Sequence, residues 1–295
     1  MEKNYWLHVI SPLHVGAGRG VGYIDLPIVR EKATNWPYIP GSAVKGVLRQ
    51  YAVDTRKQED PKKEKIDAAF GQGGDSDSSA GALVFSDAFI VCLPVRSFYG
   101  TFAWITSPLA LRRFRRRADF KNFENIPEPT SDQAVVAGGN GISPQSQGDP
   151  AKVYLEDIDL NAEHNDGAIS GIAEFLSQGV FPDDESWRSI FKRRFAVVHD
   201  DIFTFMCETG TEVSARIRID DNKKAVAKGA LWYEESLPVE TILTGTVWCD
   251  KVYGNLTPED VMKEFCDSST GSFDLQIGGK ATTGKGRVRC LFSRD

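Results

Sequence analysis

The sequence predicts an α+β fold, because strand-like and helix-like segments follow one another in mixed order and are separated by long inserts. The first segment, residues 4–15, carries apolar side chains at both odd and even positions, which is typical of a strand buried on both faces. A helical pattern follows it. The second half returns to strands, among them a long hairpin over residues 211–234. No repeat of fixed period is visible.

The first half of the chain is expected to contain a strand, a loop, a helix and a second strand. Glycine stands at every second position of the loop over residues 16–22, and the helix is expected to begin at Ser42, a natural N-cap residue. The helix places four apolar side chains on one face: Val44, Val47, Leu48 and Tyr51. Residues 54–65 form a charged connection, and residues 83–94 form the second strand.

The second half is expected to contain two helices and several strands. One helix begins at Pro108 and another covers residues 186–194. Residues 126–150 are rich in Pro, Gly, Ser and Gln, which indicates a mobile insertion. The strands are expected at 211–219, 230–234, 241–252 and 273–277, with turn residues at 220–222.

Length and composition restrict the class of protein. The 295 residues suffice for one large domain or two ordinary ones, and 41% hydrophobic with 26% charged residues argues against a disordered chain. The longest apolar runs fall short of the ~20 residues of a membrane helix, and the N-terminus lacks the pattern of a secretory signal. Five widely spaced cysteines without a C-x-x-C pair argue against a disulfide framework and a structural zinc site. We therefore expect a cytoplasmic, soluble protein with buried free thiols and no membrane partner.

The charge is unevenly distributed, although the net charge is only −6. Residues 112–117 contain five arginines, and residues 278–295 contain five cations and a single acid. Acidic residues gather instead between Glu156 and Asp166. Basic clusters on an acidic protein suit an anionic partner such as nucleic acid. A solvated surface with counter-charges nearby explains the arginine run equally well.

The C-terminal cluster contains a glycine-rich loop that matches G-x-x-x-x-G-K over residues 279–285. Gly286 stands where a P-loop has its Mg²⁺-binding Ser or Thr, and residues 287–292 alternate as a strand does, so no helix N-terminus is available for a nucleotide phosphate. Nucleotide hydrolysis is therefore disfavoured. What remains is a loop of small residues whose N–H groups can approach phosphates, flanked by Lys280 and Lys285.

Two other patterns have an ordinary structural explanation. The first glycine loop lacks the third glycine of the dinucleotide fingerprint, because Val21 stands there, and a tight turn explains it. Ser42 and Lys45 match the S-x-x-K of serine acyl-enzymes. The supporting elements of that motif are absent, so a serine–lysine acyl enzyme is kept only as an alternative.

Several residues beside these loops are candidates for a site. Lys45 and Arg49 lie four positions apart on one helix face, which suits a phosphate backbone or a solvated surface equally well. His14 and Asp25 flank the first glycine loop, and the pair Glu234-Glu235 ends the hairpin. A histidine and carboxylates can share a site for proton transfer or Mg²⁺. Taken one at a time, these residues are better explained as a structural histidine and as carboxylates on the surface.

Three segments together resemble the RAMP-superfamily proteins of CRISPR systems. They are residues 11–18 (Ser-Pro-Leu-His-Val-Gly-Ala-Gly), 39–49 (Ile-Pro-Gly-Ser-Ala-Val-Lys-Gly-Val-Leu-Arg) and 278–286 (Gly-Gly-Lys-Ala-Thr-Thr-Gly-Lys-Gly). Two further stretches, 93–109 and 211–235, are similar to the repeated backbone subunit of the type III-B (Cmr) effector complex. The resemblance covers both ends and most of the middle of the chain, and it leaves residues 121–191 poorly matched. Its motifs are specific in combination.

The resemblance implies a modified RRM-like (ferredoxin-like) palm with an inserted β-hairpin thumb and a partly helical insertion. In a single domain, the palm core would cover residues 1–110 and 238–295, the insertion 111–192 and the thumb 193–237. It also implies a subunit that binds guide RNA (crRNA), with further copies of itself in a helical filament and other subunits of the Cmr complex as partners. Such a subunit cleaves the bound complementary target RNA at six-nucleotide intervals, where the thumb displaces one base in six.

The resemblance further implies a catalytic site around Asp25, the aspartate in the loop after the first strand. Asp25 would also bind Mg²⁺ or another divalent cation, and we expect His14, Lys45 and Glu234 to take part in catalysis. The expected RNA contacts are Arg19, Ser42, Lys45, Arg49, Gly278, Gly279, Lys280, Thr283, Gly284, Lys285 and Gly286. In the family a tyrosine follows the paired glutamates, whereas Ser236 stands here, which puts the rate of cleavage in doubt. A non-catalytic RNA-binding backbone subunit is therefore the second interpretation.

Overall fold

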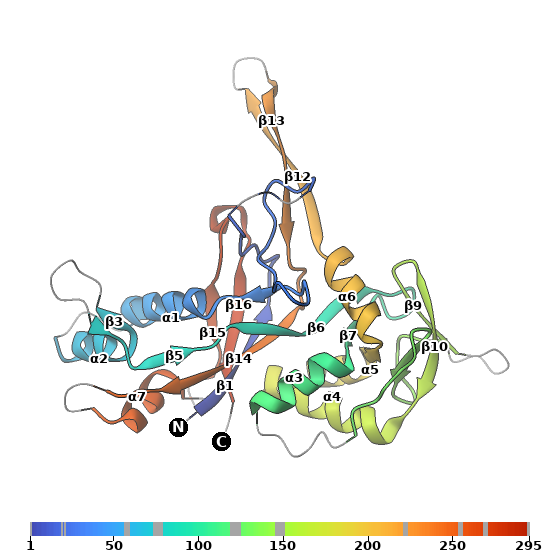
Figure 1. Ribbon diagram of the computed structural model, residues 1–295, viewed down its shortest axis with the longest axis horizontal. Coiled ribbons are helices and arrows are strands. Elements are labelled where there is room, and N and C mark those ends of the chain that lie inside the picture. Colours follow the sequence, from blue (N-terminus) through green and yellow to red (C-terminus); the bar gives the residue numbers. More distant parts are fainter. Residues whose placement is uncertain are drawn as a thin grey trace.

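One large sheet runs through the molecule (Figure 1). The computed structural model describes residues 2–18, 20, 22–55, 60–72, 79–118, 125–144, 151–220, 224–252, 256–267 and 271–293. Within these ranges the sheet has 12 strands: ten follow in the order β15-β16-β1-β14-β6-β7-β11-β8-β10-β9, β2 pairs with β6, and β5 pairs with β14. Parallel and antiparallel pairs both occur, and helices cover the sheet, so the predicted α+β class is confirmed.

The strands of the large sheet are β1 (Glu2–Val9), β2 (Tyr38–Ile39), β5 (Leu83–Phe85), β6 (Ala88–Arg96), β7 (Phe102–Thr106), β8 (Gln133–Val136), β9 (Lys152–Leu155), β10 (Ile158–His164), β11 (Phe195–Val198), β14 (Ile242–Cys249), β15 (Phe273–Gln276) and β16 (Arg287–Phe292). Two smaller pairs are β3 (Gly71–Gln72) with β4 (Ser79–Ala80) and β12 (Glu212–Asp220) with β13 (Ala225–Ser236). The helices are α1 (Gly41–Thr55), α2 (Asp60–Phe70), α3 (Pro108–Ala118), α4 (Asp166–Val180), α5 (Glu185–Arg194), α6 (Asp200–Thr209), α7 (Pro258–Phe265) and the 3₁₀ turn η2 (Ala281–Thr283).

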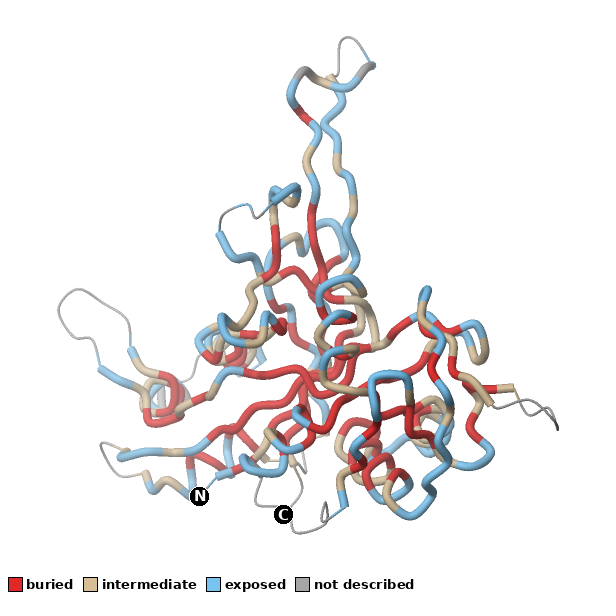
Figure 2. Tube along the Cα trace, turned by 45° about the vertical axis from the view of Figure 1, so that its right-hand side comes forward, coloured by how far each residue is buried: buried red, intermediate tan, exposed pale blue. Residues whose placement is uncertain are grey.

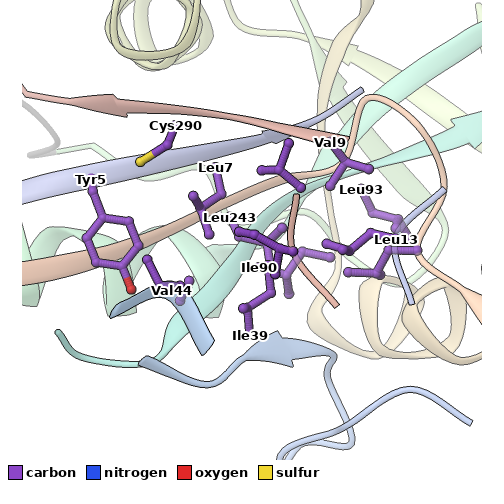
Figure 3. Packing of buried hydrophobic residues seen from close by; sticks show 14 of the residues in the cluster. Tyr5, Leu7, Val9, Leu13, Ile39, Val44, Ile90, Leu93, Leu243 and Cys290 are labelled. Atoms are coloured by element: carbon purple, nitrogen blue, oxygen red, sulfur yellow. The ribbon is translucent and has the colours of Figure 1, made fainter. Parts of the chain in front are cut away.

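β1 lies inside the sheet and is buried on both faces, as predicted. It pairs antiparallel with β14 on one side and with β16 on the other. Alternate side chains of a strand point to opposite faces. Tyr5, Leu7 and Val9 therefore join the cluster drawn in Figure 3, which also contains Val44 of α1. Trp6 enters a second cluster with side chains of α3 and α4.

β1 ends earlier than predicted, at Val9. The amides of the next two residues both donate to the carbonyl of Arg287, at 2.8 and 3.1 Å, which stops the regular ladder. An irregular segment follows, and it carries His14.

α1 has the predicted apolar face, but it begins one residue earlier than predicted. Val44 and Leu48 are buried against the sheet, as helical spacing requires. The first helical residue is Gly41, whose N–H donates to Asp87 Oδ1 at 2.8 Å, so the carboxylate of Asp87 caps the helix. The N-cap role predicted for Ser42 is wrong, because Ser42 lies exposed within the first turn.

Three other segments differ from the prediction. The charged connection over 54–65 contains the beginning of α2. The strand predicted over 83–94 is divided into β5 and β6, because Ser86 turns both its amide and its hydroxyl toward β14. The insertion over 126–150 contains β8, whose residues lie inside the large sheet, so this part was wrongly predicted to be mobile; residues 145–150 lie outside the described ranges.

The helices predicted at Pro108 and over residues 186–194 are confirmed as α3 and α5. Together with α4 they pack around buried aromatic side chains such as Trp104 and Phe191. In Figure 1 these helices and β8–β10 form a lobe on the right of the molecule. The strands of this lobe continue the large sheet through β11 and β7, so the predicted insertion, 111–192, shares one sheet with the predicted palm.

β12 and β13 form a hairpin that stands out from the body (Figure 1), and Figure 2 shows that its outer part is mostly exposed. Directly paired residues share a face of the hairpin. One face carries Ile217 opposite Leu231, both more than half exposed, and the other carries Arg216 opposite Trp232. The range predicted for the thumb, 193–237, contains β11 and α6 in addition to this hairpin.

In the described part of the chain, no helix has the length and apolarity needed to cross a membrane. The five cysteines are free, and four of them are buried: Cys92, Cys207, Cys266 and Cys290. Burial raises the pKa of each of these four thiols, so they stay protonated at neutral pH. The prediction of buried free thiols is confirmed for these four.

Candidate functional site

The irregular segment after β1 lies between the base of the hairpin and the glycine-rich loop before β16. On one side Leu13 and Leu237 exchange two backbone hydrogen bonds, of 3.0 and 2.8 Å. On the other side the Gly279 amide donates to the His14 carbonyl at 2.9 Å. Three segments that lie far apart in the sequence therefore meet: 11–16, 233–237 and 278–286.

The glycine-rich loop requires glycine where it approaches the rest of the chain. Gly278 has φ +76°, and a Cβ on it would lie 2.2 Å from the His14 carbonyl oxygen. Gly286 has φ +85°, and a Cβ on it would lie 2.3 Å from the Ile277 carbonyl oxygen. Residues 281–284 form the exposed outer part of the loop. A strand, β16, follows the loop, which confirms that it is not a P-loop ahead of a helix.

His14 is held with one ring nitrogen toward β13. Its side chain is buried, and Nδ1 lies 2.7 Å from the carbonyl oxygen of Glu235. Because a carbonyl oxygen can only accept, Nδ1 is the nitrogen that carries the proton. Nε2 then faces the glycine loops: a Cβ on Gly16 would lie 3.0 Å from it, and a Cβ on Gly279 would lie 3.7 Å from the adjacent Cδ2.

Asp25 is exposed and lies beside the same strand. Its Oδ2 accepts the backbone N–H of Tyr233 at 2.8 Å. The next residue, Leu26, donates its amide to the Tyr233 carbonyl at 3.0 Å and accepts the Glu235 amide at 3.0 Å. These bonds make a short parallel bridge between Leu26 and Glu234, so the segment that carries Asp25 is fixed to β13.

Glu234, the third residue expected at the site, is almost fully buried, with 3% exposure. It contacts four side chains: Trp232 Nε1 at 2.8 Å, Lys280 Nζ at 3.0 Å, Arg216 Nε at 3.4 Å and Lys285 Nζ at 3.5 Å. Two of these cations come from the glycine-rich loop. The carboxylate of Glu234 therefore links β13 to that loop.

The cations around Glu234 determine its protonation state. Burial acts to raise the pKa of a carboxyl group, but the hydrogen bonds from Trp232 and Lys280 and the charges of Lys280 and Lys285 outweigh burial and lower the pKa of Glu234 to about 2. Glu234 is therefore ionised at neutral pH and holds the two lysines in place. We call His14, Asp25 and Glu234 the β13 cluster, because each contacts or belongs to residues 233–235 of that strand.

Two further contacts at this site were not expected from the sequence. Lys285 Nζ donates to Ser236 Oγ at 2.8 Å, and both side chains are buried. On the opposite side of β13, Arg30 NH2 donates to Glu235 Oε1 at 2.5 Å. These partners lie 49 and 205 residues apart, so no local sequence signal marks them. The hydroxyl of Ser236 therefore binds the glycine-rich loop.

The three α1 residues predicted to contact RNA lie outside the β13 cluster. Ser42 is exposed, Lys45 Nζ donates to the Leu83 carbonyl at 2.8 Å, and Arg49 pairs with Asp67 at 3.5 Å. Among the described residues, no hydrogen bond or ion pair connects Lys45 to the β13 cluster. Burial lowers the pKa of Lys45, but its ammonium is directed at a backbone carbonyl, which does not favour the serine–lysine alternative.

Two further predictions concern the RNA contact of Arg19 and the binding of a divalent cation. Arg19, predicted to contact RNA, lies outside the described residues. The described residues contain no group of three or more His, Cys, Asp and Glu side chains that could hold a metal ion. Asp25 is thus a single exposed carboxylate, and Glu234 is already neutralised by cations. Among the described residues of this region, Asp25 is therefore the carboxylate that is open to a divalent cation.

The fold, together with the contact between the segment that carries His14 and the C-terminal glycine-rich loop, is typical of one protein family. The chain belongs to the RAMP superfamily, which matches residues 6–289. It is similar to the CRISPR system Cmr endoribonuclease Cmr4 of Pyrococcus furiosus, with 35% identity over 291 residues, 96% of this chain and 92% of that protein.

Solved structures agree with this assignment. The crystal structure of oligomeric Cmr4 from Pyrococcus furiosus matches with a TM-score of 0.75 and 30% identity, over 99% of this chain and 98% of that chain. A chain in the cryo-EM structure of the type III-B Cmr-beta bound to cognate target RNA has the same fold, with a TM-score of 0.74 at 21% identity over 99% and 97% of the two chains. The resemblance inferred from the sequence motifs is confirmed.

Proposed function

We propose that this chain is the target-cleaving backbone subunit of a type III-B CRISPR effector complex, an endoribonuclease that acts on RNA paired with a guide RNA. Its similarity along nearly the whole chain to a Cmr endoribonuclease supports the proposal. The structural observation that carries it is that Asp25 and His14 bond to the backbone of Tyr233 and Glu235, the residues on either side of Glu234 in β13. Its partners are crRNA, complementary target RNA, further copies of the same chain and other subunits of the Cmr complex.

In this proposal the large sheet forms the palm, and the β12–β13 hairpin is the thumb. The exposed apolar side chains Ile217 and Leu231 are suited to contact bases of a guide–target duplex. Lys280 and the exposed residues 281–284 lie where RNA phosphates would approach. Contacts to the backbone carry no sequence information, so target choice comes from pairing with the guide. Displacement of a base by the thumb sets the six-nucleotide interval.

The proposed reaction uses the target's own 2′-hydroxyl. The 2′-oxygen attacks the adjacent phosphorus, the P–O5′ bond breaks, and the products are a 2′,3′-cyclic phosphate and a 5′-hydroxyl. Asp25, the exposed carboxylate, takes the 2′-OH proton, and His14 in its protonated form stabilises the developing phosphate charge through Nε2 and gives its proton to O5′. Glu234 stays ionised and fixes the buried Lys285 and the partly exposed Lys280, of which Lys280 faces the phosphate. Alignment of the 2′-oxygen with the P–O5′ bond is supplied by the bound geometry.

A divalent cation remains part of the proposal as an ion brought by the RNA. Mg²⁺ in nucleic-acid sites commonly takes one or two carboxylates, with phosphate oxygens and waters as its other ligands. Asp25 is able to supply one such carboxylate. When bound, the ion would neutralise phosphate charge. Cleavage assays with and without Mg²⁺, with EDTA as the control, test this part separately.

The experiment that tests the function is target-RNA cleavage by the guide-loaded complex. Wild type should give a ladder of products spaced by six nucleotides. Asp25→Asn retains a side-chain oxygen for the Tyr233 amide and removes the charge, so it should bind target with wild-type affinity and lose the ladder. Asp157→Asn, an exposed aspartate in the β9–β10 turn, is the matched control and should cleave normally. An intact ladder from Asp25→Asn would refute the catalytic assignment.

The second interpretation is a backbone subunit that binds RNA without cleaving it. The sequence observation that favours it is Ser236 in place of the family's tyrosine. In the structure the Ser236 hydroxyl is occupied by Lys285. Target binding by the wild-type complex without any product ladder would establish this interpretation, and Ser236→Tyr would then test whether the tyrosine is the missing group.

A further inference from the structure

Glu235 joins three segments of the chain through one buried carboxylate. Its side chain is 3% exposed. Oε2 accepts the backbone N–H of Ile28 at 2.9 Å, and Oε1 accepts Arg30 NH2 at 2.5 Å and the hydroxyl of Thr211 at 2.9 Å. Ile28 and Arg30 belong to the segment that follows Asp25, and Thr211 lies at the start of the hairpin.

The backbone of Glu235 makes two more contacts, one beside Asp25 and one with His14. Its amide donates to the Leu26 carbonyl at 3.0 Å, next to Asp25. Its carbonyl accepts Nδ1–H of His14 at 2.7 Å. The residue that orients His14 through its carbonyl therefore holds the Asp25 segment with both its amide and its carboxylate.

The charge balance makes this carboxylate costly to remove. Arg30 is 15% exposed at its side chain, and the Glu235 carboxylate is the acid with which it forms an ion pair. Among the described residues, Arg30 also donates to the neutral carbonyls of Asn35 and Cys207. A buried ion whose partner is removed loses its compensation and tends to move toward solvent. Arg30 would then pull on the same segment that carries Asp25.

We infer that Glu235 is a positioning residue for RNA cleavage: it sets the place of the Asp25 segment relative to His14 without contacting RNA. The inference rests on the proposed function, because it assigns roles to Asp25 and His14. It predicts that loss of the carboxylate slows cleavage much more than it weakens target binding, since a shift of about 1 Å in a reacting group can cost on the order of a hundredfold in rate.

The test uses Glu235→Gln in the guide-loaded complex, which keeps the size of the side chain and removes its charge. Single-turnover cleavage should fall roughly 10- to 100-fold, while the Kd for target RNA should stay within about twofold of wild type. Adding Arg30→Gln to Glu235→Gln removes the uncompensated charge, so the double variant should be no slower than the single one.

The chain offers a matched control at Glu31. Its carboxylate also accepts from an arginine and a threonine, Arg113 at 2.6 and 2.9 Å and Thr34 at 2.7 Å, but it ties its segment to α3 instead of β13. Glu31→Gln should lower the unfolding midpoint and leave the cleavage rate within about twofold of wild type. If the two variants slow cleavage equally, Glu235 has only a structural role and the inference is overturned.

A second measurement does not depend on cleavage. Amide hydrogen exchange of the RNA-free chain, followed in a peptide covering residues 22–30, should be faster in Glu235→Gln, because a single amide oxygen replaces the two carboxylate oxygens that accept from the Ile28 amide, Arg30 and Thr211. Unchanged exchange there would overturn the inference even if cleavage slows. If wild type fails to cleave, the proposed function fails, and the exchange result still decides whether Glu235 positions this segment.

Discussion

The surroundings of Glu234 give the site a pH signature that can be measured in the unliganded chain. The perturbation is Glu234→Gln, which keeps the shape of the side chain and removes its negative charge. In wild type the carboxylate lies 3.0 Å from Lys280 Nζ, 3.5 Å from Lys285 Nζ and 3.4 Å from Arg216 Nε. The variant leaves these three cations close together without the anion that separates them.

The magnitude follows from the protonation equilibrium. The pKa of Glu234 falls from 4.5 to about 2 on folding, so the ionised carboxylate contributes roughly 3 kcal/mol to the free energy of unfolding at neutral pH, at about 1.36 kcal/mol per pKa unit. Because the folded-state pKa is the lower one, this contribution is complete above pH 4.5 and is lost as the pH falls toward 2. About 1.4 kcal/mol of it remains at pH 3.

Urea denaturation of wild type and Glu234→Gln at pH 7, 5 and 3 checks this reasoning. The difference in unfolding free energy should be constant between pH 7 and pH 5 and about 2 kcal/mol smaller at pH 3. Asp274→Asn is the control: its carboxylate also pairs with two arginines but is 57% exposed, so its difference should stay below about 0.5 kcal/mol. A difference for Glu234→Gln that does not change with pH would refute the assignment of an ionised carboxylate held by the lysines.

Three further predictions test the packing that supports the site. Gly278→Ala places a methyl group 2.2 Å from the His14 carbonyl oxygen and should lower the free energy of unfolding, measured in urea, by roughly 2–4 kcal/mol. Gly284→Ala is its control: with φ +81° and nothing within 4 Å of the added Cβ, it should cost only the backbone strain of about 1 kcal/mol. Equal losses of unfolding free energy in the two variants would contradict the close approach at Gly278. Asp87→Ala removes the cap of α1 and should lower the free energy of unfolding by about 1 kcal/mol, whereas an unchanged midpoint would show that the cap is dispensable. Leu7→Ala empties a fully buried position of β1 and should cost roughly 2–5 kcal/mol, and a loss below 1 kcal/mol would mean that the core closes over the cavity.

Periodic patterns in the sequence were sufficient to predict the elements whose faces are uniform. The helical spacing of Val44 and Leu48 predicted the buried face of α1, and the strict alternation over residues 211–219 predicted β12. Element ends were predicted less well, because they depend on distant hydrogen bonds. Ser86 divides one predicted strand by bonding to β14, and Arg287 ends β1 by accepting two amides. Neither partner is adjacent in sequence.

The sequence was sufficient to predict which loops carry the candidate site residues, but not which side chains contact one another there. The motifs predicted His14, Asp25 and the C-terminal glycine loop because the segments around them resemble those of the family. They did not show that Glu234 is neutralised by lysines of that loop, or that Ser236 binds Lys285, since these contacts depend on the register of strands that lie far apart. The predicted contribution of Lys45 has no support in its contacts, because its ammonium faces β5.

The register of β13 connects the exposed hairpin to the site at its base. Successive side chains of a strand point to opposite faces, so Glu234 faces the glycine-rich loop and Glu235 faces the segment after Asp25. Pairing of Glu234 with Ser214 on β12 fixes this assignment. A slip of one residue that placed Glu234 against Arg30 would turn Tyr233 toward the glycine-rich loop and leave that loop without its anion. The strand that pairs to form the hairpin also holds Asp25 and His14 through its backbone, so the proposed geometry of cleavage depends on the pairing of β12 with β13.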